Sequence, residues 1–125
     1  MKLYELLEAR TIINKNIDGT KSISAPLAYK IMKLIKNTQN DCDFYQEKFN
    51  AILNEYGEKD ENGQFIQAEG GIKIQDGKMD ECTAKVKELN ETEVELPNIK
   101  FTLDELSPYS FSISDMMLID ELIQG

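Results

Sequence analysis

The sequence feature that most constrains the fold is a series of apolar and small side chains at helical spacing in the first half of the chain. The series follows Ser24-Ala25-Pro26, where a capping hydroxyl and a first-turn proline favour the start of a helix. Gly57, at its far end, favours a helix stop. The residues repeating at steps of three and four are Leu27, Ile31, Leu34, Thr38, Cys42, Tyr45, Phe49, Ile52 and Tyr56. This heptad-like pattern, with one extra-long step in the middle, predicts a single helix from about 25 to 56.

The expected length of this helix limits how it can be covered. A helix of about 32 residues is ~48 Å long at ~1.5 Å per residue. A compact chain of this size has a radius of gyration of ~14 Å and a diameter of ~36 Å. We therefore expect the helix to project, to pair with another helix of the chain, or to pair with a second subunit. The residues predicted to form a self-association interface are Leu27, Ile31, Leu34, Tyr45, Phe49 and Ile52.

Shorter patterns predict the remaining elements. Apolar residues at helical spacing predict helices at about 2–17, 78–90 and 113–123. Short β-like runs on either side of a Gly-Gly pair predict a small hairpin at 64–75. Alternating apolar and polar residues predict two short strands between residues 93 and 103, interrupted by a proline.

The predicted fold class is α+β and mainly helical, in a single domain of residues 1–125. The long helix (about 25–56) is expected to pack with helices 2–17 and 78–90. A small β-hairpin is expected at one end, with a short helix closing the chain. We expect no membrane-spanning segment, because no apolar run approaches the ~20 residues required. The expected location is therefore the cytosol, where Cys42 and Cys82 are interpreted as core thiols rather than a disulfide.

The net charge of −9 is unevenly distributed along the chain. Residues 1–57, expected to be helical, carry eight Lys/Arg and seven Asp/Glu, whereas residues 58–125 carry six Lys and sixteen Asp/Glu. The second part therefore repels nucleic acid and anionic lipid, and it favours a basic partner surface, although solubility alone also explains the acidity. The residues predicted to form an acidic partner surface are Glu88, Glu91, Glu93 and Glu95.

Residues 55–71, EYGEKDENGQFIQAEGG, resemble a calcium-binding loop in the spacing of their acids, amides and glycine. Against this interpretation, Glu58 stands where Asp is expected, and Gly57 ends the incoming helix one residue before the loop. Two adjacent glycines also disfavour an outgoing helix. Asn62-Gly63 is a common tight-turn pair, so the sequence favours a turn, and we expect no metal site.

The composition disfavours most catalytic chemistry. Histidine is absent, which removes the commonest general base, and two cysteines cannot complete a structural zinc site. The carboxylate pairs are adjacent in sequence, and adjacent residues of a helix do not face each other across a cleft. No glycine-rich phosphate loop is present. We therefore expect a non-enzymatic protein without a cofactor.

A basic strip forms the opposite charge pattern in the first half. Lys30, Lys33 and Lys36, with Arg10 and Lys21, loosely suggest a helix-turn-helix protein. The connection between the two helices is longer than that motif allows, and the net charge of residues 1–57 is only +1. Direct nucleic-acid binding is therefore disfavoured, and the strip is an alternative contact for the acidic half of another subunit.

Four segments together resemble a family of small, functionally uncharacterised proteins of tailed phages and prophages of Gram-positive bacteria. They are PLAYKIMKLIKN (26–37), EYGEKDENGQ (55–64), LNETEVELPNIKFTLDEL (89–106) and LSPYSFSISDMMLIDELI (106–123). The resemblance implies a viral origin, expression in a bacterial host cytosol, and a role in assembly or in managing the host. It implies no catalytic residues.

These observations lead to one main functional hypothesis and two alternatives. The main hypothesis is a non-enzymatic phage or prophage interaction protein that self-associates and binds a protein partner through its acidic surface. The first alternative is a counter-defence protein, acting as a nucleic-acid mimic or as a nucleotide sponge that uses Arg10, Lys30 and Lys33. The second alternative is a virion or tail-assembly component.

Overall fold

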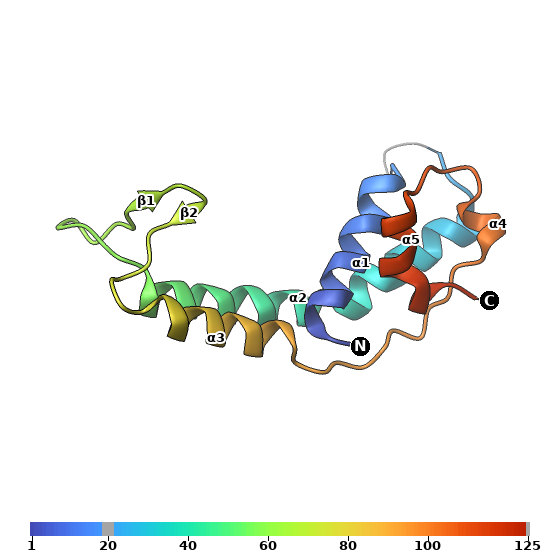
Figure 1. The fold of residues 1–125 in the computed structure, drawn as a ribbon. Helices are drawn as coiled ribbons and strands as arrows, with labels where there is room; N and C mark the ends of the chain where they lie inside the picture. The colour runs from blue at the N-terminus through green and yellow to red at the C-terminus, as the bar shows by residue number, and fades with distance from the viewer. Residues whose placement is uncertain (19–21, 125) are drawn as a thin grey trace. The chain divides into compact units, whose positions relative to one another are not determined.

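The computed structural model describes residues 1–18 and 22–124 and is α+β, mainly helical, as predicted (Figure 1). Its elements, in chain order, are α1 (Leu3–Asn16), α2 (Ala25–Tyr56), β1 (Gln67–Ala68), β2 (Gly71–Ile72), α3 (Met79–Asn90), α4 (Leu103–Leu106), α5 (Ile113–Ile119) and the 3₁₀ turn η1 (Asp120–Leu122). The expected helices, the hairpin and the closing helix are confirmed to within a few residues. The expected connection between the first two helices lies partly outside the described residues, and the cation Lys21 lies wholly outside them.

The chain forms two compact units. The first unit consists of Met1–Cys42 and Glu93–Gly125, and the second of Asp43–Thr92. The helix α2 contributes its first part to one unit and its last part to the other. The change in charge expected at residue 57 therefore falls inside the second unit, and a single folding domain remains a prediction.

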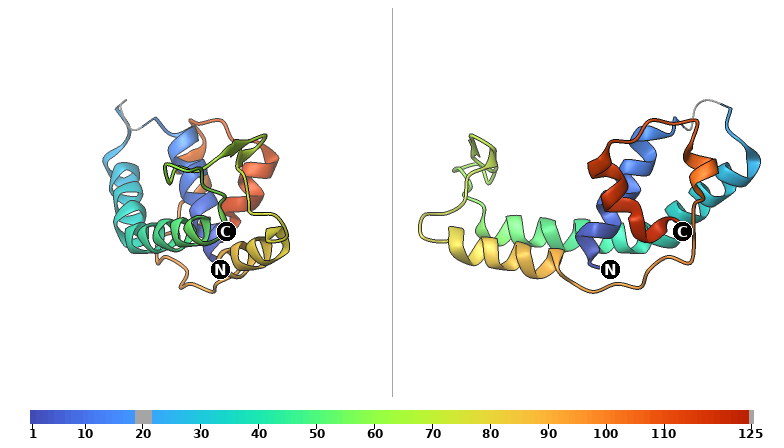
Figure 2. Two further views of the ribbon diagram at one scale, coloured as in Figure 1. Left: turned by 90° about the vertical axis from the view of Figure 1, so that its left-hand side faces the viewer. Right: turned by 45° about the vertical axis from the view of Figure 1, so that its right-hand side comes forward.

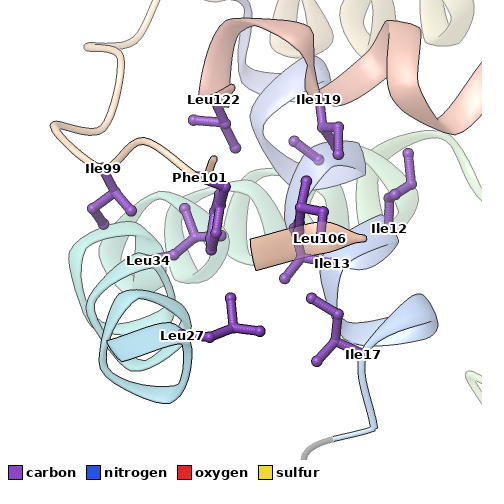
Figure 3. Packing of buried hydrophobic residues seen from close by; sticks show 11 residues of the cluster. Ile12, Ile13, Ile17, Leu27, Leu34, Ile99, Phe101, Leu106, Ile119 and Leu122 are labelled. Atoms are coloured by element: carbon purple, nitrogen blue, oxygen red, sulfur yellow. The ribbon is translucent and has the colours of Figure 1, made fainter. Parts of the chain in front are cut away.

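The core of the first unit is built from both ends of the chain. Figures 1 and 2 show α1 lying against α5, and Figure 3 shows Phe101 in the middle of the buried cluster. The Phe101 side chain is 0% exposed. Its backbone N–H donates to Leu122 O at 2.7 Å, and its carbonyl accepts from Gln124 N at 2.8 Å. The buried members of the cluster are Ala9, Ile12, Ile13, Ile17, Leu27, Leu34, Ile99, Phe101, Leu106, Ile119 and Leu122.

The second unit joins the end of α2 to α3 and the hairpin. Along α3, Cys82 and Leu89 are buried, and Figure 1 shows this helix running beside the last part of α2. Tyr56 is also buried, and its carbonyl accepts from Gln75 N at 2.9 Å. Gly70 adopts a φ of +87° in the tight turn of the antiparallel pair β1–β2, as glycine readily does.

The strands expected between residues 93 and 103 are wrong. Over these residues the backbone forms only isolated bridges, which pair Glu93 with Lys2 and Phe101 with Ile123. Leu103 starts α4 instead, because the Thr102 hydroxyl accepts from Glu105 N at 3.1 Å and the Glu105 carboxylate accepts from Thr102 N at 2.9 Å. This reciprocal capping box fixes a helix start where the alternating pattern predicted a strand.

The interpretation of the cysteines as core thiols is confirmed for Cys82, which is buried and free. Burial raises the pKa of its thiol, so it stays protonated at neutral pH. Cys42 is also free but only half-buried, and its sulfur accepts a hydrogen bond from the Arg10 guanidinium.

Candidate functional site

The residues predicted for self-association occupy different environments. Leu27 and Leu34 are 2% and 1% exposed, inside the core of the first unit, and Ile31 packs against the same core. A self-association role for Leu27 and Leu34 is therefore wrong, because α1 and the C-terminal segment of the same chain already cover them. Of the others, Tyr45 and Phe49 stack at a centroid distance of 5.8 Å in the second unit and are half-buried, as is Ile52.

The residues predicted to form an acidic surface are divided between the units. Glu88 and Glu91 belong to the second unit, and Glu93 and Glu95 to the first. All four are exposed. They are thus placed in two separate pairs. Glu93 and Glu95 line a hollow of about 590 Å³ in the first unit together with Asp41.

The cations considered for a nucleotide pocket have partners within the chain. The Arg10 guanidinium also donates to Gln39 Oε1 at 2.9 Å, and Lys30 Nζ lies 2.6 Å from Glu105 Oε1. Lys33 Nζ lies over the Tyr29 ring at 5.7 Å from its centroid. Arg10 and Lys30 therefore hold helices together, and neither lines a described groove.

The stretch that resembles a calcium loop forms a turn closed by Asp60. One oxygen of its carboxylate accepts from Asn62 N at 2.8 Å and from Gln64 N at 3.1 Å. Gly63 adopts a φ of +78°, the conformation that the Asn-Gly pair favours. Within the described residues, no three His, Cys, Asp or Glu side chains gather in a way that could hold a metal ion.

The candidate functional site is an apolar groove of about 710 Å³ on the C-terminal segment of the first unit. Three of its large side chains are unusually exposed: Ile113 by 83%, Met117 by 74% and Leu103 by 59%. The residues lining this C-terminal groove are Leu103, Phe111, Ile113, Met116, Met117, Asp120 and Ile123. Exposed apolar residues gathered in one hollow mark a surface that becomes covered on binding.

Two capped helices fix the walls of the groove. The capping box of Thr102 and Glu105 sets the start of α4 next to Leu103. The Ser112 hydroxyl accepts from Asp115 N at 3.0 Å, which starts α5 at Ile113. Ile119 and Leu122 anchor α5 and η1 in the core, whereas Ile113 and Met117, on the preceding turns of α5, stay exposed.

The groove lies in a strongly acidic segment. Residues 102–124 contain five Asp or Glu and no Lys or Arg. Glu105 is paired with Lys30, and Asp115 Oδ2 lies 3.8 Å from Lys15 Nζ. Within the described residues, the carboxylates of Asp104, Asp120 and Glu121 form no ion pair, so a cationic partner could neutralise them.

The two paired carboxylates have lowered pKa values with structural causes. For Glu105, the hydrogen bond from Lys30 is the main cause, followed by that from the Thr102 backbone, and both outweigh burial. For Asp115, burial acts to raise the pKa, but the hydrogen bond from Asn16 and the charge of Lys15 lower it overall. Both carboxylates therefore remain ionised at neutral pH. Glu105 links α4 to α2 through Lys30, and Asp115 links α5 to α1 through Lys15.

Replacing Glu105 with glutamine is expected to make stability less dependent on pH. Because the folded pKa lies below the unfolded one, the carboxylate stabilises the fold above about pH 4.3 and loses this effect as pH falls through the folded value. Urea unfolding from neutral pH to about pH 3 should thus show a shallower decline for Glu105→Gln than for the wild type. Glu8→Gln, at an exposed position of α1, is the control; equal slopes for all three proteins would contradict the prediction.

Sequence reasoning missed this groove, although a signal for it exists. Its apolar residues come from α4, from the connecting segment and from α5, and no single periodic pattern includes them. The detectable signal was local charge: a segment with five acids and no base that contains Phe111, Ile113 and Met117.

No protein-family model, curated protein or solved structure matches this chain. The chemistry of the groove must therefore support any functional assignment.

None of the helices in residues 1–18 and 22–124 combines the length and the apolar character needed to cross a membrane.

Proposed function

We propose that this chain is a non-enzymatic interaction protein that binds a cationic, apolar protein segment in the C-terminal groove. One observation carries the proposal: Ile113 and Met117 are highly exposed in a segment that has five acids and no basic residue. The apolar floor provides contact area, and the acidic rim selects the charge of the partner.

The composition of the groove suits a protein ligand. Met116 and Met117 are flexible and polarisable, so they adapt to apolar side chains of different shape. Asp120 lines the groove, and Asp104 and Glu121 belong to the same segment. Rim charges of this kind steer a partner of opposite charge and fix its orientation, whereas the apolar contact supplies most of the affinity. An amphipathic segment with Lys or Arg beside its apolar face satisfies both requirements.

We place this interaction in a phage or prophage context, on the resemblance of four segments of the chain to such proteins. The partner is then a protein of the virion or of the bacterial host. The same context accommodates a virion-assembly role and a counter-defence role, which differ in the identity of the protein that enters the groove. The nucleotide-sponge alternative is disfavoured, because Arg10 and Lys30 are already engaged within the chain.

A peptide panel tests the groove directly. Cationic amphipathic peptides should bind with micromolar affinity by fluorescence anisotropy, and acidic peptides of equal apolar content should not. Met117→Asp should weaken binding about tenfold or more, because it removes apolar contact area and places a carboxylate where apolar side chains of the peptide would bury it.

Met79→Asp is the matched control, since Met79 is an exposed methionine at the start of α3, in the second unit. It should bind the peptides like the wild type. Equal binding of acidic and cationic peptides, or unchanged binding by Met117→Asp, would exclude the groove as the binding site.

A further inference from the structure

A second exposed surface in the first unit has the opposite charge. Between Ala25 and Asn40 the sequence contains Lys30, Lys33 and Lys36 and no acidic residue. Tyr29 and Met32 are 58% and 39% exposed on this part of α2. Four residues spaced three, one and three apart share one side of the helix and are called here the basic face: Tyr29, Met32, Lys33 and Lys36.

The basic face is separate from the residues of α2 that pack in the core. Leu27, Leu34 and Thr38 are buried on the opposite side of the helix. Met32 and Lys36 also border an apolar hollow of about 440 Å³, whose floor includes Ile31 and Ile35. The basic face therefore adjoins further apolar area that a partner could cover.

The basic face and the C-terminal groove complement each other in charge and in apolar character. Lys33 and Lys36 form no ion pair with any described residue, as is the case for Asp104 and Asp120. Each surface presents large exposed apolar side chains beside its charges, such as Tyr29 on one and Met117 on the other. The two surfaces have no residue in common.

We infer that the basic face of α2 in one copy docks in the C-terminal groove of a second copy. This inference rests on the proposed function, because it assigns an occupant to the same groove. Lys33 and Lys36 would meet the acidic rim, while Tyr29 and Met32 would enter the apolar floor. Since the two surfaces differ, the contact is heterologous. A pair of copies keeps one free groove, on one copy, and one free basic face, on the other, so further copies can add and produce rings or chains.

Sedimentation of the full chain at low ionic strength tests the inference. The wild type should form a concentration-dependent series of species that shrinks at high salt, because screening weakens the charged rim. Met117→Asp blocks the groove, and the double variant Met32→Asp, Lys36→Glu blocks the basic face. Each variant alone should remain monomeric, with its association weakened about tenfold or more.

Mixing the two variants gives the decisive result. The first retains an intact basic face and the second an intact groove, so an equimolar mixture should form a one-to-one heterodimer and nothing larger. A symmetric interface would give no such rescue. If the mixture stays monomeric, or if either variant assembles alone like the wild type, the head-to-tail contact is excluded.

Exchanging the charges of two exposed residues provides a second test that does not depend on changes to apolar side chains. Asp120→Lys and Lys36→Glu each change one exposed residue, and their folding is checked by circular dichroism. Each alone should associate about fivefold more weakly. Their mixture should recover, because Lys36 of the first variant meets Asp120 of the second and the two reversed charges meet each other. The control Lys87→Glu, on α3 of the second unit, should assemble like the wild type. Failure of the mixture to recover would also exclude the contact.

The inference and the proposed function fail in different ways. Peptide binding is measured on the double variant Met32→Asp, Lys36→Glu, whose groove is intact. If the wild type stays monomeric up to about 1 mM while this variant binds cationic peptides, the docking of one copy on another is excluded and the proposed peptide-binding function is supported. If mixing Met117→Asp with the double variant restores assembly while no peptide binds, the groove recognises only the folded basic face. The proposed binding of cationic, apolar protein segments is then excluded.

Discussion

Replacing Phe101 with alanine should lower the free energy of unfolding of the first unit by about 3–5 kcal/mol. Phe101 is fully buried in the middle of the core, where it is surrounded by residues from both ends of the chain (Figure 3). Its removal leaves a cavity that well-packed neighbours cannot fill, so lost contacts add to the lost burial. A loss of this size is comparable to the whole stability of a small domain.

Urea unfolding followed by circular dichroism measures this loss. Phe44→Ala is the matched control, because Phe44 is 42% exposed on α2 and its truncation should cost about 1 kcal/mol or less. The backbone bonds from Phe101 to Leu122 and Gln124 survive the substitution. A change for Phe101→Ala no larger than that for Phe44→Ala would show that the core repacks around the missing ring. Because the C-terminal groove is built on this core, Phe101→Ala should also abolish peptide binding.

Replacing Gly57 with alanine should destabilise the second unit by about 1–3 kcal/mol. A Cβ at this position would lie 2.6 Å from the Leu53 carbonyl oxygen and 2.7 Å from the Phe65 ring. Both distances are shorter than van der Waals contact, so either the end of α2 or the Phe65 side chain must move. Gly57 also closes the helix, since its N–H donates to Leu53 O at 2.8 Å.

Gly70→Ala separates steric crowding from conformational cost. A Cβ at Gly70 meets nothing within 4 Å, but its φ of +87° disfavours a side chain. Its cost should therefore stay near 1 kcal/mol. Thermal unfolding of both variants, with the Phe65 ring resonances as a local probe, compares the two. Equal losses, or unshifted Phe65 resonances in Gly57→Ala, would show that close approach is not the reason for glycine at this position.

Local patterns predicted the helices well for physical reasons. The long helix is marked by an apolar residue at every third or fourth position between a capping Ser24 and a terminal Gly57. The closing helix is similarly marked by Ser112, whose hydroxyl caps α5. In both, the backbone satisfies its own hydrogen bonds, so a local pattern contains most of the information that specifies the structure.

The same reasoning failed where partners come from distant parts of the chain. Alternation around Val94 and Phe101 is compatible with a strand, but a strand needs a neighbour to pair with. In this segment only Glu93 and Phe101 form bridges, each with a single partner residue. Likewise, the spacing of Leu27 and Leu34 identified an apolar face without revealing what covers it. The structure shows α1 and the C-terminal segment in that place, so the part of the predicted self-association interface formed by Leu27 and Leu34 is intrachain core.

The candidate site was predictable only in its charge. The acidic character of the second half was evident, but the residues selected, Glu88 to Glu95, lie outside the groove. Leu103, Phe111 and Met117 gather only after α4 and α5 have formed and docked, which depends on tertiary packing. Their identity could not be obtained from periodicity.

The division of the chain into units also sets an order of events during synthesis on the ribosome. The second unit is one continuous stretch, Asp43–Thr92, and its contacts become available as soon as that stretch has emerged. The first unit needs α1 and α5, which are separated by nearly the whole chain, so α1 and its apolar residues must wait for the final helix. Until then the part of α1 that packs against α5 has no partner in the nascent chain and is open to chaperones.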